Sequence, residues 1–335
     1  MPEFYDLPTF TIVFTALGCL TLPVSFLTGY LILSKTPKAM ESSRIFLFNI
    51  NVWYCSTSFI FTILMCSSAL EGVPDGIHCH VFNAKIAIVL GPNFAHWMLI
   101  LSTVSLYSMS ISWLLYYVYR MAQIAFDRLA HRMSSPLGWL VAALCHLIPA
   151  LVFGFIVYNS HMPTHSILAN KNLDSTAVRR AIHSNLTFQC YSVSDKVGNV
   201  LTVAYWVILG LAIFISLIVT LKKLKSHRNM MSPKTYALHR IFTISSIFLV
   251  CAPVVVGILP NVVFLALMFL GSGGSVSMSR LCESVMATLP VWHCVIVVAT
   301  VKPYRIALLG MVGCRRFADK RNVVAIVPLS ASVTE

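Results

Sequence analysis

Residues 86–119 read IAIVLGPNFAHWMLILSTVSLYSMSISWLLYYVY and contain no aspartate, glutamate, lysine or arginine. With ~1.5 Å of rise per residue, a helix of this length reaches about 50 Å. A bilayer core needs only ~30 Å, so such a helix either tilts strongly or protrudes. Cys79 lies seven residues before the stretch, and Arg120 follows it directly. The stretch therefore predicts a long membrane helix with a cysteine near one end and a cation at the other.

The composition excludes a soluble protein. Of the 335 residues, 58% are hydrophobic and only 10% are charged, whereas soluble domains carry roughly 25% charged residues. The net charge of +13 does not indicate nucleic-acid binding, because the basic residues lie in loops between apolar spans. The first six residues include two acids and no basic residue, so we expect no cleaved signal peptide.

Charge-free windows predict an all-α membrane protein with seven transmembrane helices in one domain. A cytoplasmic tail, 302–335, follows the last helix and is too short to form a further domain. The seven spans are expected near 9–33, 45–69, 86–119, 137–157, 198–221, 241–270 and 281–301.

The distribution of basic residues predicts the orientation. Eighteen of the 24 Lys and Arg residues lie on one side, in the loops 34–44, 120–136 and 222–240 and in the tail. Because cytoplasmic loops carry an excess of Lys and Arg, the N-terminus is expected outside and the tail inside. The basic 222–240 loop is suited to an anionic inner leaflet, to a G protein, or to both.

The predicted external loops carry a sequon and two cysteines. Asn185 begins the sequence Asn-Leu-Thr in the long 158–197 loop, where N-glycosylation is possible in an extracellular segment. Of the ten cysteines, only Cys79 and Cys190 lie clearly in external loops, so we expect a disulfide between them. The neighbouring His78 and His80 could suggest a metal site, but the ligands are too few and the disulfide would use the sulfur, so no metal is expected.

Polar residues form a stripe along the third span. His96, Thr103 and Tyr107 fall in one narrow sector at ~100° per residue, together with Ser110. Such a stripe faces protein or a water-filled cavity, because facing lipid is costly. It predicts either a wall of a ligand site or contacts between helices, in which the hydroxyl groups bond to carbonyls of their own helix.

Glu283 is the only carboxylate within a predicted span. An ionisable group inside the membrane is a candidate for ligand contact, and Ala287 lies on the same face one turn further along. The alternative is that Glu283 pairs with Arg280, three residues earlier, or reaches the headgroup water.

Four stretches resemble the nematode serpentine chemoreceptors, with the Srh group most similar and the Sri group next. They are PVSFLTGYLILSKTPKAM at 23–40, LFNINVW at 47–53, MSPKT at 231–235 and KPYR at 302–305. The resemblance implies a chemosensory G-protein-coupled receptor in the plasma membrane of sensory cilia. It also implies a small-molecule ligand, a heterotrimeric G protein as partner and no cofactor.

Several residues are expected to act in switching. Arg120 occupies the place where rhodopsin-like receptors carry an acid–arginine–aromatic triplet, here without the acid, although the positive-inside rule alone also explains an arginine there. Pro253 and Pro290 lie inside spans six and seven and favour kinks. Tyr304 and Arg305 belong to the KPYR motif, and Cys314, beside two arginines, is a candidate for palmitoylation.

Three other function classes were weighed against a receptor. Some chemosensory seven-helix proteins are ligand-gated ion channels, but those have the inverted topology. A transporter would need an inverted repeat and buried ion-coupling groups, and the chain has one buried acid. An enzyme is not expected, because no aspartate lies in any span and no H-E-x-x-H motif occurs. The oligomeric state cannot be predicted.

Overall fold

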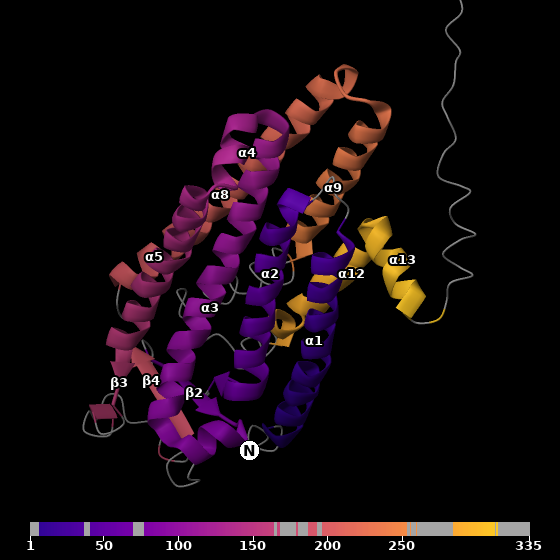
Figure 1. Cartoon of the computed structure of the whole chain (residues 1–335). Coiled ribbons are helices and arrows are strands. Elements are labelled where there is room, and N and C mark those ends of the chain that lie inside the picture. Colours follow the sequence, from indigo (N-terminus) through magenta and orange to yellow (C-terminus); the bar gives the residue numbers. More distant parts are fainter. Residues whose placement is uncertain are drawn as a thin grey trace, which may run out of the picture.

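Long helices dominate the computed structural model, and they lie side by side in an elongated bundle (Figure 1). The structure describes residues 7–36, 41–69, 77–163, 166–167, 179, 187–192, 196–252, 255, 259, 284–311 and 313. The long helices are α1 (Leu7–Lys35), α2 (Glu41–Phe59), α3 (Lys85–Ala125), α5 (Pro136–Ser160), α8 (Lys196–Ser226), α9 (Pro233–Ala252) and α12 (Leu289–Thr300). Shorter helical segments are η2 (Ile60–Met65), α4 (Asp127–Met133), η3 (His227–Asn229) and α13 (Lys302–Met311).

Five helices in the described ranges are long and apolar enough to cross a membrane, and α12 with α13 forms a sixth candidate bent by 106°. The five candidates overlap the first five predicted spans. The predicted sixth span, 241–270, coincides with α9 as far as Ala252, and its remainder lies almost wholly outside the described residues. In the predicted seventh span, residues 284–287 are helical, a turn follows at Thr288, and α12 begins at Leu289.

The central helix α3 is broken near its outer end. Gly91 has φ 82° and ψ −174°, a conformation that glycine adopts without a side-chain clash, and Pro92 follows it. Residues 85–90 therefore leave the axis of the longer part of the helix. At the other end α3 continues past Arg120 to Ala125, beyond the charge-free window.

The second helix ends earlier than the predicted boundary at residue 69. It continues from α2 into the π-helical turn η2, which ends at Met65. Cys66 then adopts a left-handed conformation with φ 41°, and its N–H bonds to the carbonyl of Phe61. This geometry stops the helix and turns the chain into a strand, which hydropathy alone did not reveal.

A small antiparallel sheet covers the outer end of the bundle. Its strands are β1 (Ser67–Ala69), β2 (Ile77–Phe82), β3 (His161–Met162) and β4 (Thr187–Ser192), in the order β1-β2-β4-β3. The register pairs Cys79 with Cys190 and His161 with Tyr191. None of these strands was predicted from the sequence. Figure 1 shows the sheet beside the lower end of α3.

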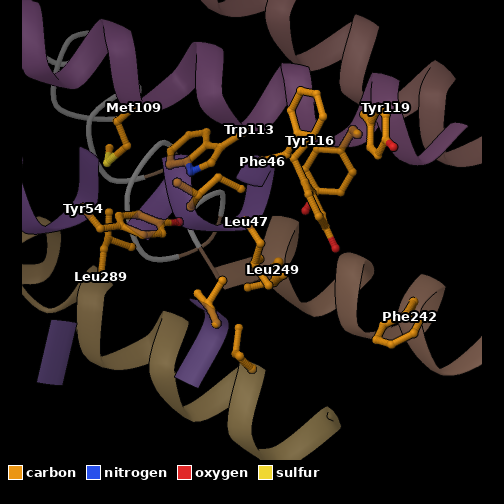
Figure 2. Packing of buried hydrophobic residues seen from close by; sticks show 14 of the residues in the cluster. Phe46, Leu47, Tyr54, Met109, Trp113, Tyr116, Tyr119, Phe242, Leu249 and Leu289 are labelled. Carbon is orange, nitrogen blue, oxygen red and sulfur yellow. The ribbon is translucent and has the colours of Figure 1, made fainter. Parts of the chain in front are cut away.

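The hydrophobic core lies where α3 packs against α2, α9 and α12. Figure 2 shows Tyr54 and Trp113 near Leu289, and Tyr116 and Tyr119 further along α3. Aromatic stacking closes the inner side of the core, since the Phe46 ring lies 4.2 Å from that of Tyr119. A second cluster, around Phe14, Ile60 and Ala287, lies nearer the sheet. The two clusters fix α3 at the centre of the fold.

Candidate functional site

The sheet is attached to α3 by covalent and polar contacts. A disulfide joins Cys79 to Cys190, as the sequence predicted, and both residues are buried. Beside it, Gln189 Nε2 donates a hydrogen bond to the carbonyl of Pro92 at 2.6 Å. Tyr191 Oη lies 3.0 Å from His96 Nδ1. The long external loop is thereby held against the outer end of the central helix.

The predicted polar stripe of α3 faces neighbouring protein elements. His96 contacts the sheet through Tyr191. Thr103 Oγ1 donates to the carbonyl of Leu99 at 3.0 Å, within its own helix. Tyr107 stacks on Phe153 of α5 with ring centroids 3.7 Å apart. These contacts correspond to the alternative in which the stripe joins helices, at least for Thr103 and Tyr107.

Ala287 lies in a different environment from the stripe. It is buried in the cluster that contains Phe14 and Ile60, and its carbonyl accepts a hydrogen bond from Ser58 Oγ at 3.3 Å. The structure thus places Ala287 against α1 and α2, whereas Tyr107 packs on α5. The remaining predicted residues Asn185, Pro253, Glu283 and Cys314 lie outside the described residues.

Sequence reasoning missed a polar group in the middle of the bundle. His293 of α12 is only 2% exposed, and its two ring nitrogens have no hydrogen-bond partner among the described residues. Its ring lies 5.1 Å from that of Tyr54, which in turn lies 6.2 Å from Trp113. A histidine within an apolar span was the available signal. Because a buried polar group without a partner is costly, these nitrogens are suited to a bound water or a polar group of a ligand.

Arg120 is buried at the inner end of α3 and is 4% exposed. Its Nη1 donates to Gln123 Oε1 at 2.6 Å, while Nε and Nη2 have no partner in the described ranges. The guanidinium carbon lies 5.5 Å from the centre of the Phe242 ring of α9. In the part of the chain that the structure describes, no carboxylate forms a salt bridge with Arg120. The cation is therefore held under α9 by an amide and an aromatic ring.

Two tyrosines of α3 hold α9 beside Arg120. Tyr117 Oη donates to the carbonyl of Ser246 at 2.7 Å, and Tyr116 Oη lies 3.1 Å from Ser246 Oγ. Thr300 of α12 bonds to Ser245 of α9 at 2.8 Å. Since these contacts join three helices on the side of Arg120, movement of α9 must break several of them together.

The KPYR motif forms the first turn of α13, directly after the bend that follows α12. Tyr304 is fully buried, and its Oη lies 2.7 Å from Thr36 Oγ1 at the end of α1. Arg305 Nη1 donates to the carbonyl of Ala299 at 3.0 Å. Pro290 lies in the first turn of α12, where a missing N–H costs little, rather than in the interior of a continuous helix. The expectation of an interior kink at Pro290 is therefore replaced by a break before it.

The described structure is a multi-pass helix bundle with a disulfide-tethered sheet at one end and a buried arginine at the other end of its central helix, an arrangement compatible with seven-transmembrane receptors. The sequence profile of the family described as "Serpentine type 7TM GPCR chemoreceptor Srh" matches residues 7–314. The chain belongs to this family, which is a family of receptors. The prediction of the Srh group is confirmed.

A curated relative is also similar over a short segment. "Serpentine receptor class H-72" of Caenorhabditis elegans is 39% identical over 51 residues, which cover 15% of this chain and 15% of the relative. This local similarity agrees with the family assignment.

Proposed function

We propose that this receptor binds a small molecule in the outer half of its bundle and activates a heterotrimeric G protein at its inner end. The observation that carries the proposal is the burial of Arg120 under α9. The alternatives of a channel and a transporter have no comparable support in the contacts of the described residues.

Burying Arg120 is energetically unfavourable as it stands. Removing a cation from water without an acidic partner costs several kcal/mol, and two of its three guanidinium nitrogens lack a partner in the described structure. A state in which α9 moves away would return the guanidinium to water or to an acceptor on a partner protein. The buried cation therefore raises the free energy of the closed state and favours opening. The contacts of Tyr117 and Tyr116 with α9 oppose this opening. This balance is what a ligand-operated switch requires.

The proposed ligand site includes two polar side chains. His293 offers two ring nitrogens without partners in an apolar surrounding that includes Tyr54. His96 lies at the junction of α3 with the sheet. A small, mainly apolar molecule with one hydrogen-bonding group fits such an environment, because binding would satisfy His293 and bury apolar surface.

The proposal is tested by reconstituting the receptor in nanodiscs with purified G-protein heterotrimers. Nucleotide exchange is then measured during a screen of volatile and soluble compounds. At least one compound is expected to accelerate exchange, and His293→Leu is expected to reduce its potency. A sharp melting transition would show that the receptor is folded. If the folded receptor does not accelerate nucleotide exchange on any G protein with any compound, the coupling is refuted.

Arg120→Leu is expected to abolish coupling while leaving the melting temperature unchanged or raised. The substitution removes the positive charge that a G protein would contact, and it also removes an unfavourable buried cation from the receptor. Basal and stimulated exchange rates should both fall by more than tenfold. Arg128→Leu is the matched control, because Arg128 is exposed on α4 and its loss should change neither quantity. If Arg120→Leu instead lowers the melting temperature and retains exchange, the arginine is structural.

The proposed orientation places the N-terminus and the sheet outside the plasma membrane, with sensory cilia as the expected location. The disulfide supports this orientation, since such bonds persist in oxidising compartments. A tag at the N-terminus should be stained on intact cells, and a tag at the C-terminus only after permeabilisation. The reverse pattern would favour the inverted topology of a channel. Asn185→Gln should also remove a glycosidase-sensitive mass shift.

A further inference from the structure

One face of the external sheet is rich in histidine. The register pairs His161 with Tyr191, Tyr191 with His78, and Gln189 with His80. Residues directly opposite each other in an antiparallel pair share a face, and so do residues two apart on a strand. These five residues therefore lie on one face, and the two disulfide cysteines lie on the other.

A fourth histidine joins this face from α3. The rings of His96 and His161 lie 4.3 Å apart, and those of His78 and His80 lie 4.5 Å apart. Tyr191 lies between the two pairs, with its ring 5.9 Å from His96 and 6.4 Å from His80. The four histidines thus form one cluster around Tyr191, which we call the histidine face.

The hydrogen bonds of Gln189 determine which ring nitrogen of a neutral His161 carries the hydrogen. The Pro92 carbonyl can only accept, so the Gln189 amide nitrogen must point toward it, at 2.6 Å. Gln189 Oε1 then accepts from His161 Nε2, also at 2.6 Å. A neutral His161 therefore keeps its lone pair on Nδ1, with the ring of His96 close by.

The surroundings of the histidine face offer little to balance positive charge. The described elements packed against it are β1, β2, β3, β4, α3 and α5, and their sequences contain no aspartate or glutamate. Tyr158 of α5 contributes a ring 5.8 Å from His96, and Lys85, exposed at the start of α3, is itself a cation. Protonation of several histidines here would create repulsion without a described counter-charge.

The half-buried histidines of β2 resist protonation while the sheet is closed. Burial lowers the pKa of His78 to about 4. Burial, and next the nearby His78, hold the pKa of His80 well below its ordinary value. When the sheet separates from α3, water regains access and each pKa returns toward ~6.5. Below that pH the open sheet takes up protons that the closed sheet does not, so acid favours opening.

We propose that the histidine face is a binding site for protons, through which external acid releases the sheet from α3. Protons would then be a second input to this receptor, chemically distinct from a small molecule in the bundle. Each histidine protonated only in the open state shifts the equilibrium toward opening by about tenfold per pH unit below ~6.5. Two such residues give about a hundredfold at one unit below that value.

Reduction of the Cys79–Cys190 disulfide by a phosphine reports opening, because both cysteines are buried in the closed sheet. The full-length receptor in nanodiscs is treated with tris(2-carboxyethyl)phosphine at pH 7.4, 6.5 and 5.5. Released thiols are alkylated and quantified by mass spectrometry. Oxidised glutathione in the same tube corrects for the pH dependence of the reagent. The corrected reduction rate is expected to rise at least tenfold between pH 7.4 and 5.5.

Replacing the histidines should remove this dependence. His78→Asn, His80→Asn and His96→Asn should each flatten the pH profile, and the triple variant should be nearly insensitive to pH. His131→Asn, at an exposed position of α4, is the control and should behave as the wild type. If the triple variant does not fold, the three single variants decide the matter. A wild-type rate that does not change with pH, or a dependence that survives these substitutions, would overturn the proposal. The measurement involves neither ligand nor G protein, so its outcome is independent of the proposed function.

Discussion

Loss of the Cys79–Cys190 bond is expected to destabilise the receptor by about 4–5 kcal/mol. The bond closes a ring across a sequence separation of 111 residues. Because the ring stays closed when the protein unfolds, the bond lowers the conformational entropy of the unfolded chain and so stabilises the folded state. In the folded protein the bond also holds β2 against β4, and β4 carries the Gln189 and Tyr191 contacts to α3. Its removal should therefore reduce thermal stability and delivery to the cell surface together.

A double-mutant cycle provides the measurement. Cys79→Ser and Cys190→Ser should each lower the melting temperature and the surface-stained fraction, and the double variant should be little worse than either single one. Cys19→Ser is the control, because Cys19 is a free and exposed cysteine of α1. Losses that add up in the double variant would mean that the two cysteines act separately.

Gly18→Leu is expected to prevent the close packing of α1 against η2. A Cβ atom at Gly18 would clash with Thr62 Oγ1 and lie 2.9 Å from Ile63 Cδ1. Thr62 cannot yield easily, since its hydroxyl donates to the carbonyl of Ser58 at 2.7 Å, and Thr21 bonds to Ser58 Oγ at 2.7 Å. Overpacking at such a contact typically costs about 1–3 kcal/mol, and the branched side chain of leucine should reach the upper end.

Gly210→Leu is the matched control for this prediction. Gly210 is a helical glycine of α8, and a Cβ atom there would meet nothing within 4 Å. It should tolerate leucine, which has the higher helix propensity. The melting temperatures of the two purified variants in one detergent give the comparison. Equal melting temperatures would show that the α1–η2 contact does not limit stability.

Much of the architecture could be predicted from local chemistry. A charge-free window of membrane length must form a helix, because its backbone groups can be satisfied in lipid only by bonds within the segment. This argument located α3 and the helices around it. Cys79 and Cys190 could be paired because the topology left them as the two clearly external cysteines. The confirmed family assignment agrees with motifs such as KPYR, whose Tyr304 and Arg305 the structure places in the first turn of α13.

The contacts of the site residues could not be predicted in this way. Angular position on α3 placed His96, Thr103 and Tyr107 on one face, but it did not show that His96 meets Tyr191 while Tyr107 stacks on Phe153. Nor did it show that Arg120 lies under Phe242, 122 positions later in the chain. A membrane helix is apolar all round, so its sequence carries little information on which neighbour each face meets.

The sequence by itself therefore determined the class of protein, its helical membrane architecture, the disulfide and the family, because each depends on local hydropathy, charge or motif. The tertiary structure alone decided the external sheet, the histidine face and the closed position of Arg120. Short strands such as β3 and β4 have no periodic pattern of their own, and they form because the disulfide and the outer end of α3 hold distant segments together. Pairing across more than a hundred residues is a property of the folded chain, and no local signal encodes it.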